Sequence, residues 1–414
     1  MSSTPHRTRI RDRVAAVFSG RKPDRIPFID RLELWHKTHV RAGTPSHGAR
    51  GGTLPAEFRG LSLTDIHRRV GLGQQKFMAA YGQRLGGVEL IVQHRPPDGV
   101  SFGGQTLRHE VDPVVEFFPR MPGLAVQDQV GLTDITLTTP VGRLTLQYEM
   151  LPEMVAAGTE GYIREHLIKS PADYPIVEFI LERMEWVPQY AQIQAMEAEL
   201  GDIGYVAPML GRTPFQQVLL EYLGEMNAFY ALHDDPRPVV RLLGLLDARI
   251  TEALHGLGGW PIQYAEFGDN LHSLITNPRL FKEYCLPYYR RYADILHGQG
   301  KKMGSHTDGD VRTLLGLLAE SGLDVAEAFS PAPMTTCTNE EAWAAWPSGP
   351  MIWGGIPSTI LEETFPESEF RDFIARLLDG VGDRPIILGV GDQVMGNDLI
   401  DRVRWIAEQV EARG

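Results

Sequence analysis

The chain has 414 residues, 43% of them hydrophobic and 22% charged, a composition typical of globular proteins with a sizeable buried core. Lys and Arg number 40 against 53 Asp and Glu, and the formal net charge of −13 argues against nucleic-acid binding. No window approaches the roughly 18 apolar residues of a membrane-spanning helix. The only cysteines are Cys285 and Cys337, which excludes a disulfide framework or a cysteine-rich zinc site. We expect a cytoplasmic protein.

In chain order, the first predicted element is a short parallel strand at residues 25–30, where the sequence reads RIPFID. Residues 41–60 are rich in Gly, Pro and Ala and are expected to form a mobile loop that closes over a site. A second parallel strand is predicted at residues 88–94, VELIVQH. From about residue 97 to 150, β-like segments alternate with turn signals, which predicts an antiparallel β insertion rather than a separate domain.

The C-terminal half alternates short apolar runs with segments of helical period, the pattern of repeated βα units. Six strands are predicted there, at residues 205–210, 261–267, 301–306, 324–329, 351–356 and 385–390. Together with the two earlier strands they make eight, which favours a closed TIM-type (β/α)8 barrel over an open doubly wound sheet. No G-x-G-x-x-G motif follows an early strand, which weakens a dinucleotide-binding alternative. We therefore predict an α/β fold in which residues 1–414 form one barrel domain.

Barrel enzymes carry their chemistry at the C-terminal ends of the strands, where the βα loops meet in one mouth. Polar residues at or just after the predicted strand ends are therefore the candidates for function. They are Asp30, Arg31, Arg212, Glu266, Asp269, His306, Asp308, Glu327 and Asp392.

The stretch GSHTDGD at residues 304–310 predicts half of a metal site. His306 and Asp308 lie two residues apart at a strand tip, so their side chains can point the same way. An imidazole with a carboxylate suits zinc and similar divalent ions. The plain alternative is a turn in which Asp308 caps the next helix and His306 is simply hydrogen-bonded. Asp392, at another strand end, is the third predicted ligand.

Four further residues are predicted to act in catalysis. Glu266 and Glu327 are expected near the metal. Glu327 lies inside an apolar strand and, if it points into the barrel, needs a partner, a metal or a proton. Arg212 could anchor a substrate carboxylate, although a structural ion pair is equally consistent with the sequence. In a decarboxylase, Asp30 or Glu327 could donate or accept a proton.

Three segments carry a family resemblance. They are RVAAVFSGRKPDRIPF near the start, GRTPFQQVLLEYLGEMNAFYALHDDPRPVVRLL in the middle, and the later stretch from GDNLHSLITNPRLF to ESGLDVAEAFSP. These segments resemble the uroporphyrinogen decarboxylase superfamily, which also contains corrinoid-linked and coenzyme M methyltransferases. The resemblance implies a TIM-type barrel, spans most of the chain, and is weakest from residue 40 to 150.

The methyltransferase branch, as the resemblance implies, binds zinc through an H-x-C pair at one strand end and a Cys in a turn after the last strand. The matching positions here are His306, Asp308 and Asp392, so both thiolates are replaced by carboxylates. Oxygen ligands make a harder site, which would suit an oxygen-bearing substrate or a different ion. The decarboxylase branch resembles a metal-free enzyme with an Arg-rich segment after strand 1. This chain has FIDRLELWHK there, with Arg31 alone, which disfavours tetrapyrrole decarboxylation.

Three functions are compatible with these observations. The leading prediction is a metal-dependent methyltransferase of the demethylase type that acts on a small organic substrate, with zinc as the first choice of metal. No corrinoid-binding D-x-H-x-x-G segment is present, so a corrinoid would arrive on a separate protein or free in solution. The runner-up is a decarboxylase or related lyase of a small carboxylic acid, and the third is a non-catalytic ligand-binding barrel. A homodimer is the assembly considered, and neither nucleic acid nor a membrane is an expected partner.

Overall fold

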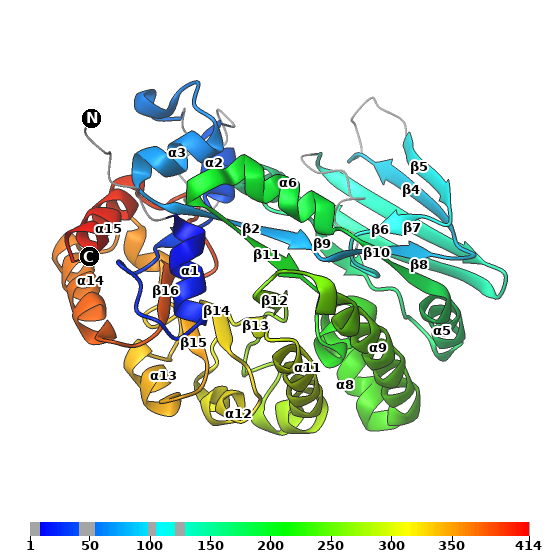
Figure 1. Cartoon of the computed structure of the whole chain (residues 1–414). Helices are drawn as coiled ribbons and strands as arrows, with labels where there is room; N and C mark the ends of the chain where they lie inside the picture. The colour runs from blue at the N-terminus through cyan, green and yellow to red at the C-terminus, as the bar shows by residue number, and fades with distance from the viewer. Residues whose placement is uncertain (1–8, 41–53, 98–104, 121–128, 414) are drawn as a thin grey trace.

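The computed structural model describes residues 9–40, 54–97, 105–120 and 129–413, and its centre is an eight-stranded parallel barrel (Figure 1). Around the barrel the order is β1 (Ile29–Asp30), β2 (Gly73–Ala79), β11 (Gly204–Met209), β12 (Tyr264–Phe267), β13 (Lys302–His306), β14 (Val325–Phe329), β15 (Met351–Ile356) and β16 (Ile386–Val390). Every neighbouring pair is parallel, and a parallel bridge from Phe28 to Leu388 links the last strand to the first. The predicted TIM-type barrel is confirmed.

Helices cover the barrel and the sheets attached to it. They are α1 (Ile10–Phe18), α2 (Glu33–Val40), α3 (Leu63–Val70), α4 (Pro152–Ala157), α5 (Tyr174–Arg183), α6 (Tyr190–Leu200), α7 (Pro214–Gln217), α8 (Glu225–Asp234), α9 (Pro236–Gly256), α10 (Pro278–Leu280), α11 (Leu286–Gly298), α12 (Leu315–Ala319), α13 (Asn339–Ala345), α14 (Glu367–Val381) and α15 (Ile400–Ala412). Helix α9 has an N-terminus defined by a side-chain cap and a proline. Asp235 caps it by accepting from the backbone N–H of Arg237, and Pro236 occupies its first turn.

An antiparallel part is inserted between β2 and α6 and projects from one side of the barrel (Figure 1). Its strands are β3 (Tyr81–Leu85), β4 (Glu89–Arg95), β5 (Gln105–Val111), β6 (Val114–Val115), β7 (Gly131–Thr139), β8 (Gly142–Met150), β9 (Tyr162–Glu165) and β10 (Met184–Pro188). They form a five-stranded sheet, β5-β4-β7-β8-β9, and a three-stranded sheet, β10-β3-β6. The insertion expected at residues 97–150 is therefore present, but its strands run from Tyr81 to Pro188.

The prediction of a barrel strand at residues 88–94 is wrong. This segment contains β4, which pairs antiparallel with β5 and β7, and its alternating burial is typical of a sheet with one face on the core. The second barrel strand is β2, whose sequence GQQKFMA was not predicted because it contains no apolar run. Two of its polar residues, Gln74 and Gln75, are nevertheless buried.

The predicted mobile loop at residues 41–60 is described only in part, since residues 41–53 lie outside the described residues. The remainder contains a 3-10 turn at Ala56–Phe58. Phe58 is buried and meets Trp35 of α2 edge-on, with ring centroids 5.8 Å apart. This end of the segment is therefore anchored in the core.

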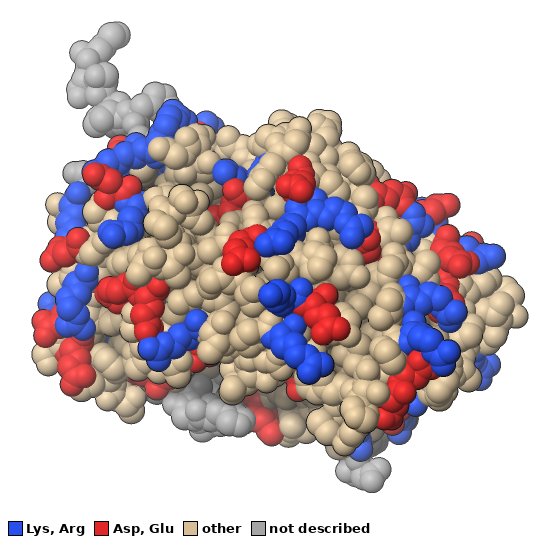
Figure 2. Space-filling model, turned by 90° about the horizontal axis from the view of Figure 1, so that it is seen from below, with Lys and Arg blue, Asp and Glu red and all other residues tan. Residues whose placement is uncertain are grey.

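The face of the molecule seen from below is mixed in charge. Figure 2 shows Lys and Arg side chains interspersed with Asp and Glu on one face, without a broad area of one sign. Among the helices that the structure describes, none is long and apolar enough to span a membrane.

Side chains along the barrel strands alternate between two buried layers. The inward-facing layer includes Ile29, Tyr264 and Trp353, and Phe18 of α1 packs into it at the N-terminal ends of the strands. The Phe18 ring stacks on Tyr264 with centroids 5.2 Å apart, and its centroid lies 6.5 Å from that of Trp353. The interior of the barrel below its mouth is thus packed with aromatic and aliphatic side chains.

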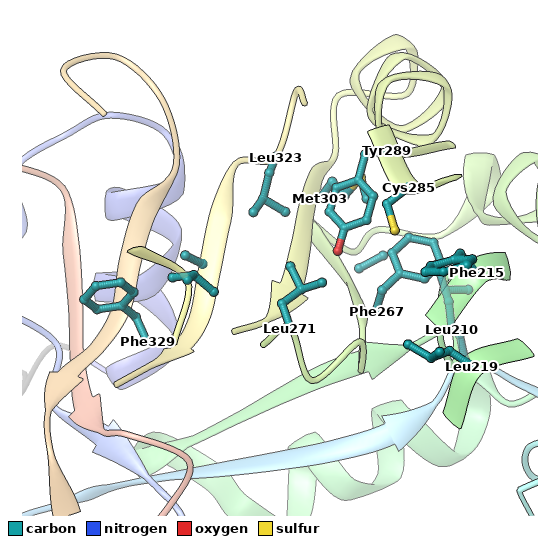
Figure 3. Close-up of a cluster of buried hydrophobic side chains, with 14 of the residues drawn as sticks. Leu210, Phe215, Leu219, Phe267, Leu271, Cys285, Tyr289, Met303, Leu323 and Phe329 are labelled. Carbon is teal, nitrogen blue, oxygen red and sulfur yellow. The ribbon is translucent and has the colours of Figure 1, made fainter. Parts of the chain in front are cut away.

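The outward-facing layer lies between the strands and the helices (Figure 3). Phe267 of β12, Cys285 and Tyr289 lie together in it. The Tyr289 hydroxyl also donates to Asp269, 2.5 Å away, and Asp269 accepts from the backbone N–H and the hydroxyl of Thr213. This buried network joins the loops that follow β11 and β12 to helix α11.

Replacing Phe18 by Ala should lower the free energy of unfolding by about 3–5 kcal/mol, because it opens a cavity in the inward-facing layer. Urea denaturation followed by circular dichroism would measure this loss. Val141→Ala is the control, since Val141 is 53% exposed and its truncation should change stability by less than about 0.5 kcal/mol. Equal stability of the two variants would contradict a packed barrel interior.

Candidate active site

His306 is held by a buried carboxylate on the neighbouring strand. It is the last residue of β13, and the parallel register places it beside Glu327 of β14. Its Nδ1 lies 2.5 Å from Glu327 Oε2, while Gln75 of β2 donates from Nε2 to the other oxygen, Oε1, at 3.0 Å. Glu327 is 1% exposed, so these contacts supply the partners that an inward-pointing carboxylate needs.

The proton and the charge of this pair follow from burial and proximity. Burial disfavours an imidazolium, but the carboxylates of Glu327, Asp392 and Asp308 together outweigh it and raise the pKa of His306 well above its ordinary value. Burial likewise acts to raise the pKa of Glu327, yet the charged imidazole, with Arg31 and a hydrogen bond from Glu266, outweighs it and lowers that pKa. The two groups form an ion pair, and a metal that binds at Nε2 must displace the proton carried there.

Two aspartates face the second nitrogen of His306. Asp392 follows β16, and its Oδ1 lies 3.4 Å from His306 Nε2. Asp308 follows β13, and its Oδ2 lies 3.8 Å from the same nitrogen. The aspartate side chains are 26% and 27% exposed, against 9% for His306. The three side chains predicted as metal ligands thus gather at the C-terminal ends of the strands, with solvent on the aspartate side.

Arg31 holds Asp392 in this position. Its Nη2 donates to Asp392 Oδ1 at 2.9 Å and to the Asp392 carbonyl oxygen at 2.8 Å. Burial acts to raise the pKa of Asp392, but contact with His306 and the charge of Arg31 hold it well below its usual range. The guanidinium also lies over the ring of Phe77 of β2, 4.8 Å from its centroid, and the same ring meets His306 edge-on.

Asp308 is held by a second chain of hydrogen bonds. Asn270 donates from Nδ2 to Asp308 Oδ2 at 2.9 Å, and Asn270 Oδ1 accepts from Arg212 at 2.6 Å. Arg212 also pairs with Glu221, from Nε to Oε1 at 2.8 Å, and with the carbonyl oxygen of Gly268. The guanidinium predicted as a substrate anchor is therefore engaged within the chain, as in the structural ion pair considered from the sequence.

Asp30, which was predicted to donate or accept a proton, lies where β1 and β16 close the barrel. Its Oδ1 accepts from the backbone N–H of Arg31 at 2.6 Å, and its Oδ2 accepts from the backbone N–H of Val390. Burial raises the pKa of Asp30 well above its ordinary value. Its hydrogen bonds tie the two strands together at the closure of the barrel.

Glu266 of β12 lies fully buried in the same polar group. Its Oε2 accepts from the Tyr264 hydroxyl at 2.7 Å, and its Oε1 has no hydrogen-bond partner among the described residues. Burial, followed by the neighbouring Glu327 carboxylate, raises the pKa of Glu266 well above its ordinary value. As a carboxylic acid, Glu266 can donate to Glu327, which satisfies the otherwise unpaired oxygen.

Two sets of side chains could hold a metal ion. Within the described residues, Glu266, His306 and Glu327 are the group whose ligand atoms all lie within 4.8 Å of one another. In that set Glu327 already contacts Nδ1 of His306, and both glutamates are closed to solvent. The set of His306, Asp308 and Asp392 uses Nε2 and is backed by a carboxylate on the other ring nitrogen, as histidine ligands usually are. We favour this set, although one aspartate must shift for all three to reach one ion.

Two separations within the set of His306, Asp308 and Asp392 are close to those of a divalent metal site. Tetrahedral nitrogen and oxygen ligands about 2.1 Å from zinc lie about 3.4 Å from one another. The separations from His306 Nε2 to Asp392 and Asp308 are 3.4 and 3.8 Å. Carboxylates in place of thiolates make the site a harder one.

Three non-glycine residues around the site have a left-handed backbone. The φ angle is 48° at Asn270, 55° at Ala328 and 64° at Asp392. Asn and Asp tolerate this region, whereas for Ala it costs about 1 kcal/mol or more. Ala328 lies at an irregularity between Glu327 and Phe329, where the register with β15 shifts. A bulge at this place re-aims the neighbouring side chain, here the carboxylate that holds His306.

Sequence reasoning missed three residues that support the predicted ligands. Gln75 and Phe77 lie on β2, which has no apolar run to mark it as a strand. Asn270 lies in the loop GDN after β12, and its place directly after a predicted strand end was a usable signal.

Substitutions of Ala328 should separate backbone strain from packing. Ala328→Gly should leave the free energy of unfolding unchanged or raise it by up to about 1 kcal/mol, since Gly adopts a positive φ freely. Ala328→Val should lower it by about 1–3 kcal/mol, because a β-branched side chain is strained there. Chemical denaturation of both variants would measure the difference, and equal stabilities would contradict the left-handed conformation.

Asp398 should make stability depend on pH. It lies in the loop that carries Asp392, its Oδ2 accepts from the backbone N–H of Met395 at 2.7 Å, and its Oδ1 is buried with no hydrogen-bond partner among the described residues. Burial raises the pKa of Asp398 to about 8. Between about pH 4 and 8 the folded state therefore binds a proton that the unfolded state has released, so this group's contribution falls as pH rises.

Asp398→Asn should remove this dependence. The unfolding free energy of the variant minus that of the parent chain should be larger at pH 8 than at pH 5, by about 1 kcal/mol or more. Thermal or urea denaturation at the two pH values would measure the gain. A constant difference between the two proteins across this range would contradict the raised pKa.

Comparison with known proteins agrees with the fold and the resemblance. Residues 229–413 match the family model described as uroporphyrinogen decarboxylase (URO-D). A solved structure of a methyltransferase from Methanosarcina mazei is similar to the chain with a TM-score of 0.52 and 12% sequence identity, over 98% of this chain and 99% of that one. No curated protein matches the sequence. The resemblance to the uroporphyrinogen decarboxylase family is therefore confirmed over residues 229–413, and the solved methyltransferase structure shares the fold.

Proposed function

We propose that the chain is a metal-dependent methyltransferase of the demethylase type, which removes a methyl group from an oxygen of a small organic molecule. The observation that carries the proposal is the meeting of His306 Nε2 with the carboxylates of Asp308 and Asp392 at the barrel mouth. A nitrogen with two oxygen ligands favours an oxygen-bearing substrate over a thiol. The similarity in fold to a methyltransferase supports the reaction class.

A divalent ion bound at this site would act as a Lewis acid that stabilises the negative charge left on the substrate oxygen. In the transfer, the bond between the methyl carbon and that oxygen breaks, and the electron pair stays with the oxygen. The methyl group goes to a nucleophilic acceptor, which we propose is a corrinoid carried by a separate protein or supplied free in solution.

Side chains of the protein hold and orient the three proposed metal ligands. Glu327 fixes the ring of His306 from behind, so that Nε2 faces the mouth. Arg31 and Asn270 each hold one of the two aspartates by a hydrogen bond to the oxygen nearest His306. Every predicted ligand thus has one supporting partner, which limits the loss of side-chain entropy on binding an ion.

Two other functions stay open to test. A decarboxylase would need a cationic anchor and a proton carrier, and both Arg212 and Asp30 are engaged by groups within the chain. Activity that survives chelation and His306→Ala would nevertheless favour it. A pure ligand-binding barrel would retain ligand affinity after replacement of Asp308 or Asp392.

Metal analysis and a transfer assay test the proposal. Reconstituted protein should bind about one equivalent of zinc, whereas His306→Ala and Asp392→Asn should bind less than about a tenth of one. With aryl methyl ethers as donors and cob(I)alamin as acceptor, methylcobalamin formation followed by absorbance should disappear in both variants. Asp134→Asn is the matched control, since Asp134 of β7 lies in the antiparallel insertion and pairs with Arg95. A parent chain that retains no metal after reconstitution would refute the proposal.

A further inference from the structure

We infer that Gln75 is a positioning residue that fixes the Glu327 carboxylate and, through it, selects the nitrogen of His306 that faces the metal. This inference rests on the proposed function, because it assigns the metal to His306 Nε2. It concerns a residue on β2, 252 positions before Glu327 in the sequence.

Gln75 and His306 each contact one oxygen of the Glu327 carboxylate, beside the protonated Glu266 that can also donate to it. Gln75 Nε2 donates to Glu327 Oε1 at 3.0 Å, and His306 Nδ1 lies 2.5 Å from Oε2, so each oxygen has its own partner. Gln75 and Glu327 are 2% and 1% exposed. Water therefore cannot replace the amide as donor without a rearrangement of the barrel interior.

The orientation of the Gln75 amide is set by its neighbour. The amide oxygen cannot face Oε1 of Glu327, because two acceptors would then meet, so the NH2 group must point to the carboxylate. With Oε1 occupied in this way, Oε2 is left to accept the proton on His306 Nδ1. The nitrogen that can release its proton to an ion is then Nε2, on the side of Asp308 and Asp392.

A packing role alone does not account for an amide at this position. Burying an amide costs free energy unless it is hydrogen-bonded, so a residue needed only to fill this space would be apolar. The next inward-facing residue of the same strand, Phe77, also serves the site: its ring meets that of His306 edge-on and lies beneath Arg31. Strand β2 therefore supports both the imidazole and the arginine that holds Asp392.

The adjacent residue provides a matched control. Gln74 has the same side chain, is 4% exposed, and points to the other face of β2, where it accepts from the Thr64 hydroxyl at 2.9 Å. A substitution there perturbs the same strand to a similar degree. It does not touch Glu327 or His306.

The experiment compares Gln75→Met with Gln74→Met in the full-length chain. Each variant loses the amide and keeps a similar volume. Competition against a chelating dye measures zinc and cobalt(II) affinity, the visible absorption of the cobalt(II) form reports coordination geometry, and thermal melting reports folding. We expect Gln75→Met to bind either ion about 10–100-fold more weakly, with an altered cobalt spectrum. Gln74→Met should match the parent chain in affinity and spectrum.

The outcomes separate this inference from the proposed function. If the parent chain binds metal and Gln75→Met keeps its affinity and spectrum, the inference is overturned while the proposed function stands. If both variants lose affinity and melting temperature together, the role of Gln75 is structural and the inference is again overturned. If Gln75→Met fails to fold, Gln75→Asn, whose amide is drawn back by one methylene, must show the weaker binding. Absence of metal in the parent chain overturns both.

Discussion

The contact between His306 Nδ1 and Glu327 Oε2 is the interaction on which the rest of the candidate site depends. At 2.5 Å, between side chains that are 9% and 2% exposed, it joins the ends of two adjacent strands. An imidazolium and a carboxylate in this setting attract strongly, and removing either would leave an uncompensated buried charge. Because this pair fixes the ring, the position of Nε2 is set by the barrel itself and not by a loop.

The barrel supplies that rigidity through layers of different chemistry. At the N-terminal ends of the strands, Phe18, Tyr264 and Trp353 fill the interior with aromatic rings. A buried polar layer of Gln75, Glu266 and Glu327 joins three strands. The half-open aspartates lie at the mouth. The packed layers support the site from below, while the residues at the mouth can be exchanged without disturbing the barrel. This agrees with a fold that supports many chemistries at its strand ends.

The sequence was sufficient for most of the barrel because strands buried on both faces read as apolar runs, and all six strands predicted in the C-terminal half are present. Strand β2 could not be predicted in this way, since a strand that lines a polar site contains polar residues in place of an apolar run. His306 and Glu327 could be placed together because parallel strand ends converge. The bonds of Gln75 and Asn270 could not be predicted, because they depend on side-chain directions across residues far apart in the chain.

Only Ala80 separates strand β2 from β3, the first strand of the antiparallel insertion. From Gln75 to Ala79 this strand pairs with β11 alone, because its pairing with β1 covers only Gly73 and Gln74. The strand that carries Gln75 and Phe77 therefore has one end in the barrel and the other next to the antiparallel insertion. A displacement of the insertion relative to the barrel would reach the histidine pocket first through the backbone of β2.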